Sequence, residues 1–328
     1  MNIQDFDGVR EIAITDFDGV KIGNAENAAA GTGCTVILCE KGAVAGVDVR
    51  GGGPATRETE ALKSVNLVEK IHAVVLSGGS AFGLDAASGV MKFLEERGVG
   101  FETGFGKVPL VCGASLFDLN VGDGRVRPDG AMGYAACANA ISGNFTEGNF
   151  GAGTGASVGK YLGSARMMKS GIGAFAVQVG AVKCGAVVAV NALGDVVDDR
   201  DGRIVAGLLN ENGDGFADSE GILLRDIERG RNIYQINTTL GCVLTNARLT
   251  KTAANRLAMV AHNGYARVIR PVHTSADGDT IFAMSTRDVD VDADVLGSLA
   301  SAVIARAAVR AVRAAQPAYG LKAARDIR

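Results

Sequence analysis

Residues 72–98 read HAVVLSGGSAFGLDAASGVMKFLEERG, and this stretch indicates the class of the fold. His72–Ser77 is a short apolar run with β-branched residues, which is typical of a buried strand. Small residues then open a patterned segment that ends at Gly98, a residue suited to terminating a helix. A buried strand followed directly by a helix is the basic unit of an α/β protein.

Further strand and helix signals lie on both sides of this unit. Residues 172–198 are nearly continuous β signal, and residues 108–118 suggest another strand. The small-residue segment Gly130–Ile141 predicts a helix. The N-terminal part predicts three early strands and one charged helix, in chain order Glu11–Ile22, Cys34–Cys39, Ala43–Val49 and the helix Thr56–Leu67.

The composition changes from Asp199 to Gln235. This segment is rich in Gly, Asn, Asp and Glu, and we expect a long exposed loop with a short helix near Ile222–Ile227. Regular patterns then resume as strand, helix, strand and helix: Leu240–Thr245, Thr250–Ile269, Thr280–Ser285 and Asp292–Ala314. No proline- or serine-rich linker separates the two patterned blocks, so the sequence predicts one α/β domain.

The composition argues against several classes of protein. The 328-residue chain is 47% apolar and 21% charged, which is typical of a globular protein and not of a disordered chain or a coiled coil. A net charge of −3 gives no basic surface for nucleic acid or an anionic membrane. No apolar run approaches the ~18 residues of a membrane span, and the N-terminus lacks a signal-peptide pattern. We therefore expect a soluble, cytoplasmic protein.

Cysteine and histidine are placed in a way that argues against metal chemistry. The six cysteines lie in apolar stretches without a C-x-x-C pair, and we interpret them as buried free thiols. Only three histidines are present, His72, His262 and His273. The chain is short of residues for a zinc site, and we expect neither a metal nor an organic cofactor.

The glycine-rich stretch GAGTGASVGK at residues 151–160 resembles several functional loops, most of which fail on spacing. A phosphate loop would need a glycine where Thr154 stands and a serine or threonine where Tyr161 stands. Residues Gly155–Gly159 do match G-x-S-x-G, the pattern of a serine-nucleophile elbow, with a later histidine available as partner. A serine esterase using Ser157 therefore stays open as an alternative.

Three other features fit together chemically. Asn237-Thr238-Thr239 stands where the polar segment becomes a strand, and Asp277-Gly278-Asp279 forms a turn before the next strand. The third is Lys160, a cation in the glycine-rich loop, with Asn191 at the end of an apolar strand. A threonine hydroxyl becomes a nucleophile when a base takes its proton, and its own α-amino group, with a pKa near ~7.7–8.0, is one such base. That amine is free only if the preceding peptide bond breaks.

At these residues the chain resembles the L-aminopeptidase/D-Ala-esterase/amidase family of self-processing hydrolases, and most closely its 6-aminohexanoate-oligomer hydrolase branch. The resemblance runs from about Asp16 to about Ala314 and rests on LSGGSAFGLDAASGV, GAGTGASVGK, VVAVN, NTTLGCVLTNARLT and PVHTSADGDTIFAMST, in that order. It implies an αββα sandwich. It also implies self-cleavage between Asn237 and Thr238, which would divide the single hydrolase domain into a large subunit of residues 1–237 and a small subunit of residues 238–328.

The resemblance also implies roles for the residues of the site. Thr238 is the expected nucleophile, and Asp277 and Asp279 are expected to hold its amine and hydroxyl in position. Lys160 near the amine would keep that amine an unprotonated base. Asn191 would donate through its side-chain amide to the oxyanion.

Three more residues are expected at the substrate: Phe117, Gly153 and Gly155. Some relatives carry a tyrosine near the site where this chain has Phe117, so a hydroxyl donor is missing and the substrate preference is open. We expect hydrolysis of aminoacyl amides, small peptides or ω-amino-acid oligomers. The alternatives are an amino-acid acyltransferase with the same self-cleaved threonine, and a non-enzymatic small-molecule binding protein.

The expected partners follow from the same resemblance. They are a small amide or peptide substrate, the cleaved subunits for one another, and further copies of the chain in a homotetramer or a larger ring. We expect no nucleic acid and no membrane as partner.

Overall fold

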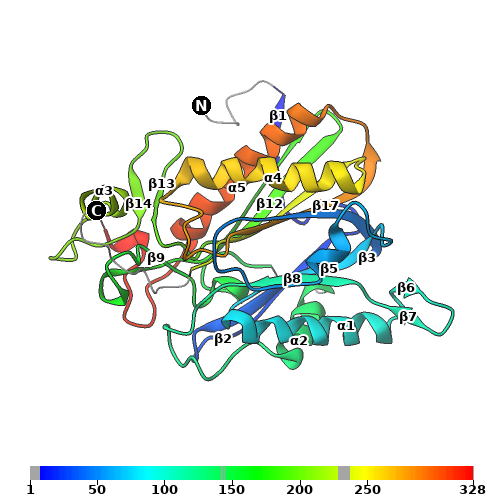
Figure 1. Ribbon diagram of the computed structural model, residues 1–328, viewed down its shortest axis with the longest axis horizontal. Coiled ribbons are helices and arrows are strands. Elements are labelled where there is room, and N and C mark those ends of the chain that lie inside the picture. Colours follow the sequence, from blue (N-terminus) through cyan, green and yellow to red (C-terminus); the bar gives the residue numbers. More distant parts are fainter. Residues whose placement is uncertain (1–7, 142, 144, 228–236, 328) are drawn as a thin grey trace.

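Two β-sheets lie face to face between two pairs of helices in the computed structural model, which describes residues 8–141, 143, 145–227 and 237–327. Helices α4 (Lys251–Val268) and α5 (Ala293–Ala314) cover one sheet, and α1 (Ala86–Glu96) and α2 (Gly130–Ile141) cover the other (Figure 1). The predicted αββα sandwich is therefore confirmed.

The first sheet has the strand order β1-β11-β12-β15-β17-β3, and β15 and β17 are its parallel pair. The second sheet consists of the first half of β3 with β2, β5, β8 and β4, and β5 and β8 are parallel. The strands of both sheets span, in chain order, Val9–Ile12 (β1), Lys21–Asn27 (β2), Thr32–Val49 (β3), Thr56–Arg57 (β4), Ile71–Ser77 (β5), Val111–Ser115 (β8), Ile172–Val179 (β11), Val182–Ala189 (β12), Leu240–Ala247 (β15) and Thr280–Val289 (β17).

Strand β3 belongs to both sheets. Its residues 44–49 pair with β17, and its residues 32–38 pair with β2. The sequence predicted two separate strands, Cys34–Cys39 and Ala43–Val49, but the backbone stays extended between them. The pairing with β5 shifts register between Leu38 and Ala43, so an irregularity lies where the prediction placed a break.

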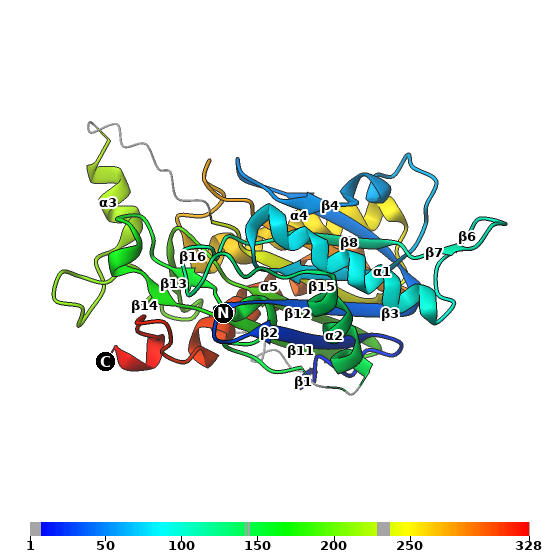
Figure 2. The ribbon, with the colours of Figure 1, turned by 90° about the horizontal axis from the view of Figure 1, so that it is seen from below.

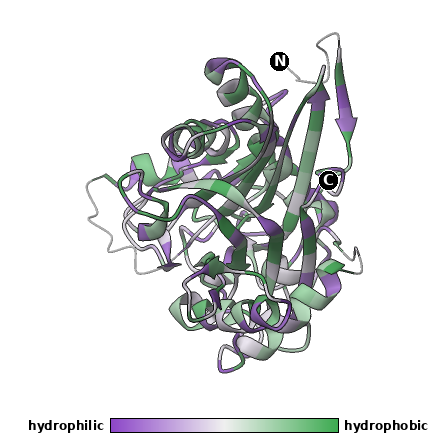
Figure 3. Cartoon of the chain, turned by 90° about the vertical axis from the view of Figure 1, so that its right-hand side faces the viewer, coloured by the Kyte–Doolittle hydropathy of each residue, from purple (hydrophilic) through white to green (hydrophobic). Residues whose placement is uncertain are grey.

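Three apolar clusters fill the spaces between the layers. One contains Val74, Leu240 and Phe282 and lies between the two sheets, because its members come from strands of both. A second joins α4 and α5 to the first sheet, and a third joins α1 and α2 to the second. Figure 3 shows green, apolar stretches on the strands enclosed between the helix layers. This burial of both faces explains the near-continuous β signal of residues 172–198.

The helix ends follow their sequence signals. The Thr250 side chain accepts from the Ala253 N–H at the start of α4, and the Asp292 side chain caps α5 in the same way. Helix α1 ends just before Gly98, which has a φ of +66°. Helix α5 is long and apolar enough to cross a membrane, but it is mostly buried and packs on the first sheet as a core helix.

Two early predictions are wrong. The segment predicted as the helix Thr56–Leu67 contains the short strand β4 and a 3₁₀ turn at Thr59–Leu62, of which only Leu62 is buried. A helix there would have no apolar face to pack. The predicted strand Glu11–Ile22 is interrupted by a turn in which the Ala13 N–H donates to the Asp16 carboxylate at 3.0 Å.

The polar segment from Asp199 to Gln235 contains short regular elements, and its part from 228 to 235 lies outside the described residues. Helix α3 (Ser219–Arg225) begins three residues before the predicted Ile222–Ile227, because the Asp218 side chain caps it. Figure 2 shows α3 and the β6–β7 hairpin projecting at opposite ends of the molecule. The remaining short strands are Phe101–Glu102 (β6), Lys107–Val108 (β7), Ser157–Val158 (β9), Met168–Lys169 (β10), Asp195–Val197 (β13), Ile204–Ala206 (β14) and Ile269–Arg270 (β16).

One consequence of this architecture bears on function. Strands β15 and β17 lie after residue 238, yet they pair with β12 and β3 in the middle of the first sheet. The two predicted subunits therefore contribute to one sheet. All six cysteines are buried and free, as predicted.

Candidate active site

The junction Asn237-Thr238-Thr239 is buried at the start of β15 and is held on two sides. The Thr238 N–H donates to the carbonyl oxygen of Asn191, just beyond β12, at 2.9 Å. On the other side, the Gly278 N–H donates to the carbonyl oxygen of Asn237 at 3.0 Å. The structure therefore places the predicted threonine between the predicted asparagine and the predicted Asp-Gly-Asp turn.

The carbonyl of Asn237 has two donors. The Thr238 hydroxyl donates to the same oxygen as the Gly278 N–H. A side chain at position 278 would lie 2.7 Å from the Thr238 Oγ1 and 2.6 Å from the Gly53 carbonyl oxygen. Only glycine fits there, and its N–H points where negative charge would develop if this carbonyl were attacked.

The two aspartates of the turn have different partners. The Asp279 Oδ1 accepts from the Thr239 N–H at 2.7 Å, and its Oδ2 lies 2.9 Å from the His273 Nδ1. The Asp277 Oδ2 accepts from both the backbone N–H and the hydroxyl of Thr274 at 2.7 Å each. The Asp277 Oδ1 is buried and has no hydrogen-bond partner among the described residues. Asp277 therefore has an oxygen available for a ligand, whereas both oxygens of Asp279 are occupied by hydrogen bonds to Thr239 and His273.

The titration of Asp277 reflects this environment. Burial, and after it the charge of Asp279, raise the pKa of its carboxyl to about 6. The hydrogen bonds from Thr274 and the charge of Lys160 oppose the shift. A cation at the unpaired oxygen would favour the ionised form.

Lys160 lies fully within the protein and contacts Asn191. Its Nζ donates to the Asn191 Oδ1 at 2.7 Å. Burial lowers the pKa of the Lys160 amine to about 7, against the charges of Asp277, Asp118 and Asp279. This pKa lies close to neutral pH. Lys160 and Thr238 both contact Asn191, Lys160 at the side-chain Oδ1 and Thr238 at the backbone carbonyl oxygen.

The side chain of Asn191 is oriented by three contacts. Its Oδ1 accepts from Lys160 and, at 3.1 Å, from the Ser157 N–H. Its Nδ2 donates to the carbonyl oxygen of Phe117 at 2.9 Å. An amide group has two N–H hydrogens, so one remains to donate to an oxyanion. Phe117 is half-buried and joins the site through its backbone.

Gly153 and Gly155, predicted to allow close approach to substrate, are buried against other backbone. A side chain at 153 would lie 2.2 Å from the Ile172 nitrogen, and one at 155 would lie 2.1 Å from the Gly31 carbonyl oxygen. The missing side chains therefore permit close packing of the loop on β11 and on the turn after β2.

Ser157 lies in β9, which pairs with β10, and not at the strand-to-helix turn that a nucleophile elbow needs. Its hydroxyl is buried and has no hydrogen-bond partner in the described part of the chain. The two candidate histidines contact other groups, since the His262 Nε2 lies 3.1 Å from the Asp48 carbonyl oxygen and His273 contacts Asp279. The serine triad considered from the sequence is therefore not assembled.

Two buried charged residues beneath the site escaped the sequence analysis. The Lys169 Nζ donates to the carbonyl oxygens of Gly153, Ala156 and Ser170, which fixes the loop that carries Lys160. Asp118 accepts from the Thr32 hydroxyl at 2.8 Å and from the Gly79 N–H at 2.7 Å. Asp118 follows Phe117 directly, and no local spacing signal marks either residue.

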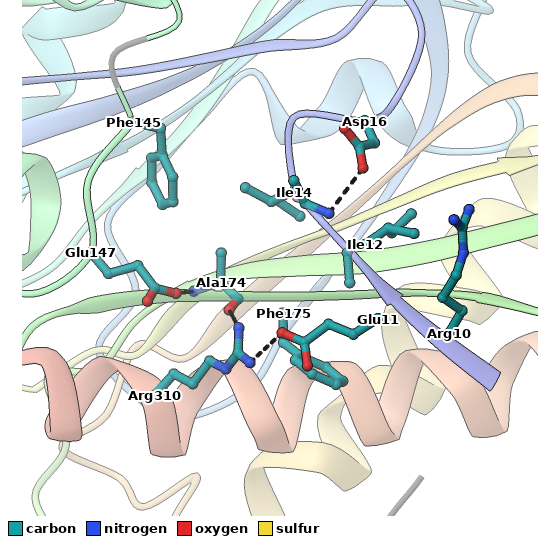
Figure 4. Close-up of a pocket in the computed structure, with 12 residues that line it drawn as sticks. Arg10, Glu11, Ile12, Ile14, Asp16, Phe145, Glu147, Ala174, Phe175 and Arg310 are labelled. Carbon is teal, nitrogen blue, oxygen red and sulfur yellow. Dashed lines mark hydrogen bonds and ion pairs between the residues drawn. The ribbon is translucent and has the colours of Figure 1, made fainter. Parts of the chain in front are cut away.

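A separate cavity of about 450 Å³ opens beside β1. Figure 4 shows Arg310 paired with Glu11, and the Glu147 Oε1 accepts from the backbone N–H of Ala174 at 2.6 Å. The guanidinium carbon of Arg310 lies 4.8 Å from the centroid of the Phe175 ring. None of the predicted site residues lines this cavity.

Comparison with known proteins adds an independent finding. The sequence profile of peptidase family S58 matches residues 13–325. An uncharacterised aminopeptidase of Mycobacterium leprae is 38% identical over 94% of this chain and 92% of its own length. A 6-aminohexanoate-oligomer endohydrolase of Kocuria sp. is 34% identical over 93% of this chain and 87% of its own.

Solved structures resemble the fold over nearly the whole chain. The β-aminopeptidase of Burkholderia sp. superimposes with a TM-score of 0.68 at 21% identity, over 96% of this chain and 91% of that one. The L-aminopeptidase D-Ala-esterase/amidase of Ochrobactrum anthropi, a variant of the Ntn-hydrolase fold, gives a TM-score of 0.66 at 22% identity, over 93% and 86%.

Proposed function

The chain belongs to peptidase family S58 and is a hydrolase that acts on amide bonds, and on that premise we propose that Thr238 is its nucleophile, released by self-cleavage of the Asn237–Thr238 bond. The observation that carries the proposal is the environment of the Asn237 carbonyl. Its oxygen receives the Thr238 hydroxyl and the Gly278 N–H, in a buried position enclosed by the turn.

The self-cleavage step is an N-to-O acyl shift followed by hydrolysis. The Thr238 Oγ1 attacks the carbonyl carbon of Asn237, and the Gly278 N–H stabilises the charge on the oxygen. The new C–O bond forms as the C–N bond breaks, and the hydroxyl proton ends on the departing nitrogen of Thr238. Water then hydrolyses the ester, which leaves a carboxylate on Asn237 and a free amine and hydroxyl on Thr238.

The mature site repeats this chemistry on a substrate. The free amine of Thr238 takes the proton of its hydroxyl, the Oγ1 bonds to the substrate carbonyl carbon, and the same proton passes to the leaving nitrogen as the C–N bond breaks. Water then hydrolyses the acyl ester, which releases the acid product and restores the Thr238 hydroxyl. The remaining N–H of Asn191 donates to the oxyanion, a contribution typically of ~2.7–4 kcal/mol per donor. The unpaired Oδ1 of Asp277 holds the ammonium form of the Thr238 amine.

The substrate class we propose is linear amides with a small or flexible acyl part. Curated relatives are named aminopeptidases and 6-aminohexanoate-oligomer endohydrolases, which supports aminoacyl amides, small peptides or ω-amino-acid oligomers. The subunits 1–237 and 238–328 stay docked after cleavage, because the adjacent strands β15 and β17 lie between two strands of the large subunit. β15 pairs with β12, and β17 pairs with β3.

Intact-mass measurement of the purified protein tests the proposal. We expect two polypeptides, of residues 1–237 and 238–328, and N-terminal sequencing of the smaller should begin Thr-Thr-Leu-Gly-Cys. The two should co-elute on a sizing column until denaturant separates them. A chain that stays whole while it hydrolyses amides would remove the N-terminal amine from the mechanism.

Replacing Ser157 with alanine separates the two candidate nucleophiles. Because the Ser157 contact with Asn191 is made by its backbone N–H, Ser157→Ala should keep both self-cleavage and most turnover of an aminoacyl p-nitroanilide. Steady-state kinetics and the fragment pattern report the two properties. Normal processing with turnover lower by ~10⁴-fold or more, the scale of a lost nucleophile, would favour the serine instead.

A further inference from the structure

His273 is tied to Asp279 in an unusual way. Its backbone N–H donates to the Asp279 Oδ2 at 3.2 Å, and its ring Nδ1 lies 2.9 Å from the same oxygen. A carboxylate only accepts, so Nδ1 carries the proton and donates. The backbone of His273 has a φ of +57°, a left-handed conformation that few residues other than glycine adopt, although asparagine, aspartate and histidine are the most frequent among them. Such conformations persist where the surroundings hold them in place.

The Asp279 carboxylate connects His273 to the nucleophile strand. While its Oδ2 receives both donors of His273, its Oδ1 receives the Thr239 N–H at 2.7 Å. Thr239 adjoins Thr238, and the Thr239 carbonyl oxygen accepts from the Thr280 N–H at 3.0 Å. The Asp279 carboxylate is therefore the side chain that holds the Thr239 N–H, next to the backbone contacts of Thr239 with Thr280 and of Thr238 with Asn191.

The His273 ring also lies near two aromatic side chains of α4. The ring centroids of His262 and Tyr265 lie 4.8 Å and 6.3 Å from that of His273. Burial lowers the pKa of His262 to about 4 and raises the pKa of Tyr265, so both are neutral near neutral pH. Asp48 and Arg50 act on His262, and the charge of Asp279 acts on Tyr265.

The ring orientation of His273 depends on Asp279. The His273 Nε2 is buried and has no hydrogen-bond partner among the described residues. Asp277 in the same turn bonds Thr274, and Lys160 acts on Asp279 only across space. Among the described residues, the contact with Asp279 is therefore the hydrogen bond that holds the imidazole, whereas the carboxylate also accepts from the backbone N–H groups of His273 and Thr239.

We propose that His273 is a positioning residue: its Nδ1–H fixes the Asp279 carboxylate, which holds the Thr239 N–H and thereby aims the Thr238 hydroxyl. In the precursor the target is the Asn237 carbonyl, and in the mature enzyme it is the substrate carbonyl. This role rests on the proposed function. It asks nothing of His273 as an acid or base, and it requires only a donor at the δ position of the side chain.

Substitutions by asparagine, aspartate and glycine test the role, because all three tolerate a positive φ. Asparagine places an N–H where Nδ1–H stands. Aspartate has the same shape but presents an oxygen that repels Asp279, and glycine removes the side chain. The readouts are the half-time of precursor cleavage by intact mass, and kcat and KM of the cleaved fraction on an aminoacyl p-nitroanilide.

We expect His273→Asn to stay within about threefold of wild type in cleavage rate and kcat. His273→Asp should lose about 100-fold in kcat, the scale of a misplaced reacting group, with KM changed less than threefold. His273→Gly should fall between them. If His273→Asp does not fold, the asparagine and glycine pair makes the same comparison.

Three results would overturn the role. Wild-type rates in His273→Asp or His273→Gly would show that the contact is dispensable. Equal losses in all variants, asparagine included, would show that ring packing and not the donor matters. A change confined to KM would make His273 a substrate contact.

A control variant and a comparison with wild type distinguish a failure of the positioning role from a failure of the proposed function. His72 accepts from the Leu110 N–H at 3.1 Å in the second sheet, and His72→Asn should leave kcat unchanged. Wild type that is never cut would remove the proposed nucleophile and its positioning residue together. Wild type that is cut normally while His273→Asp and His273→Gly match it would remove only the positioning role.

Discussion

Thr238→Ala should yield a single uncut polypeptide of 328 residues that does not hydrolyse amides. In the proposed mechanism the same hydroxyl serves both reactions: it lies against the Asn237 carbonyl, and after cleavage it would be the N-terminal nucleophile. Turnover should fall by about 10⁴-fold or more, as expected when a nucleophile is lost. Intact mass measures the first effect, and steady-state kinetics on an aminoacyl p-nitroanilide measure the second.

Two further variants make the result specific. Thr238→Ser keeps a hydroxyl and should still be cut. Thr239→Val keeps the β-branched shape at the start of β15 and removes a buried hydroxyl that has no hydrogen-bond partner among the described residues, so it should be cut and active. A cut elsewhere in residues 199–236, with full activity in Thr238→Ala, would refute the mechanism.

Local sequence signals predicted most helices and strands, and tertiary pairing explains the exceptions. The caps at Thr250 and Asp292 and the glycine after α1 act within a few residues, so they are readable from the sequence. The false helix at Thr56–Leu67 follows a glycine triplet that packs on the distant Asp-Gly-Asp turn, where the Gly53 N–H donates to the Asp277 carbonyl oxygen at 2.8 Å. That contact is invisible to periodicity. The arrangement of the four layers came from the family resemblance.

The site was predictable as a set of residues but not as a set of contacts. Thr238, Asp277, Asp279, Lys160 and Asn191 do come together at the ends of β12, β15 and β17, but from separate parts of the chain. The different role of each residue depends on hydrogen bonds between residues that are far apart in the sequence. The two aspartates look equivalent in the sequence, and only the structure shows that the Asp277 Oδ1 has no hydrogen-bond partner among the residues it describes.

His273 illustrates the same limit. The sequence offered it as the base of a serine triad, because the order of serine and histidine fitted that motif. In the structure its ring contacts the carboxylate of Asp279, six residues later in the sequence, and not Ser157. Lys169 is a second example, since its three carbonyl partners become neighbours only when the glycine-rich loop folds back on β10.

The difference between the two aspartates predicts different outcomes for Asp277→Asn and Asp279→Asn. An asparagine at 277 can keep its oxygen on Thr274 and place its amide nitrogen where the unpaired Oδ1 stands. The fold should therefore be unchanged, but the group that we propose holds the Thr238 ammonium is lost. We expect kcat to fall by ~10²–10³-fold, the scale of a lost electrostatic contact to the reacting centre, with little change in KM.

An asparagine at 279 meets donors on both sides, from Thr239 and from His273. Its amide nitrogen must face one of them, and a buried donor left unmatched costs ~1–3 kcal/mol. Asp279→Asn should therefore lower the free energy of unfolding as well as the cleavage rate. Urea denaturation of the uncut form of each variant separates the two cases. Only Asp279→Asn should lower the urea concentration at the midpoint of unfolding.

The pH dependence of self-cleavage adds a test of Asp277 when it is followed below the Lys160 pKa of about 7. The pKa of Asp277 in the uncut chain is raised to about 6, so its carboxylate is lost as the pH falls through that value. If the carboxylate promotes the departure of the Thr238 nitrogen by attracting its developing positive charge, wild-type cleavage should slow below about pH 6, and Asp277→Asn should be slow and flat across the same range. The measurement is a time course of precursor cleavage on both sides of this pKa. Wild-type rates in both aspartate variants at every pH would make the turn a scaffold and leave the Thr238 amine without the counter-charge on which this mechanism depends.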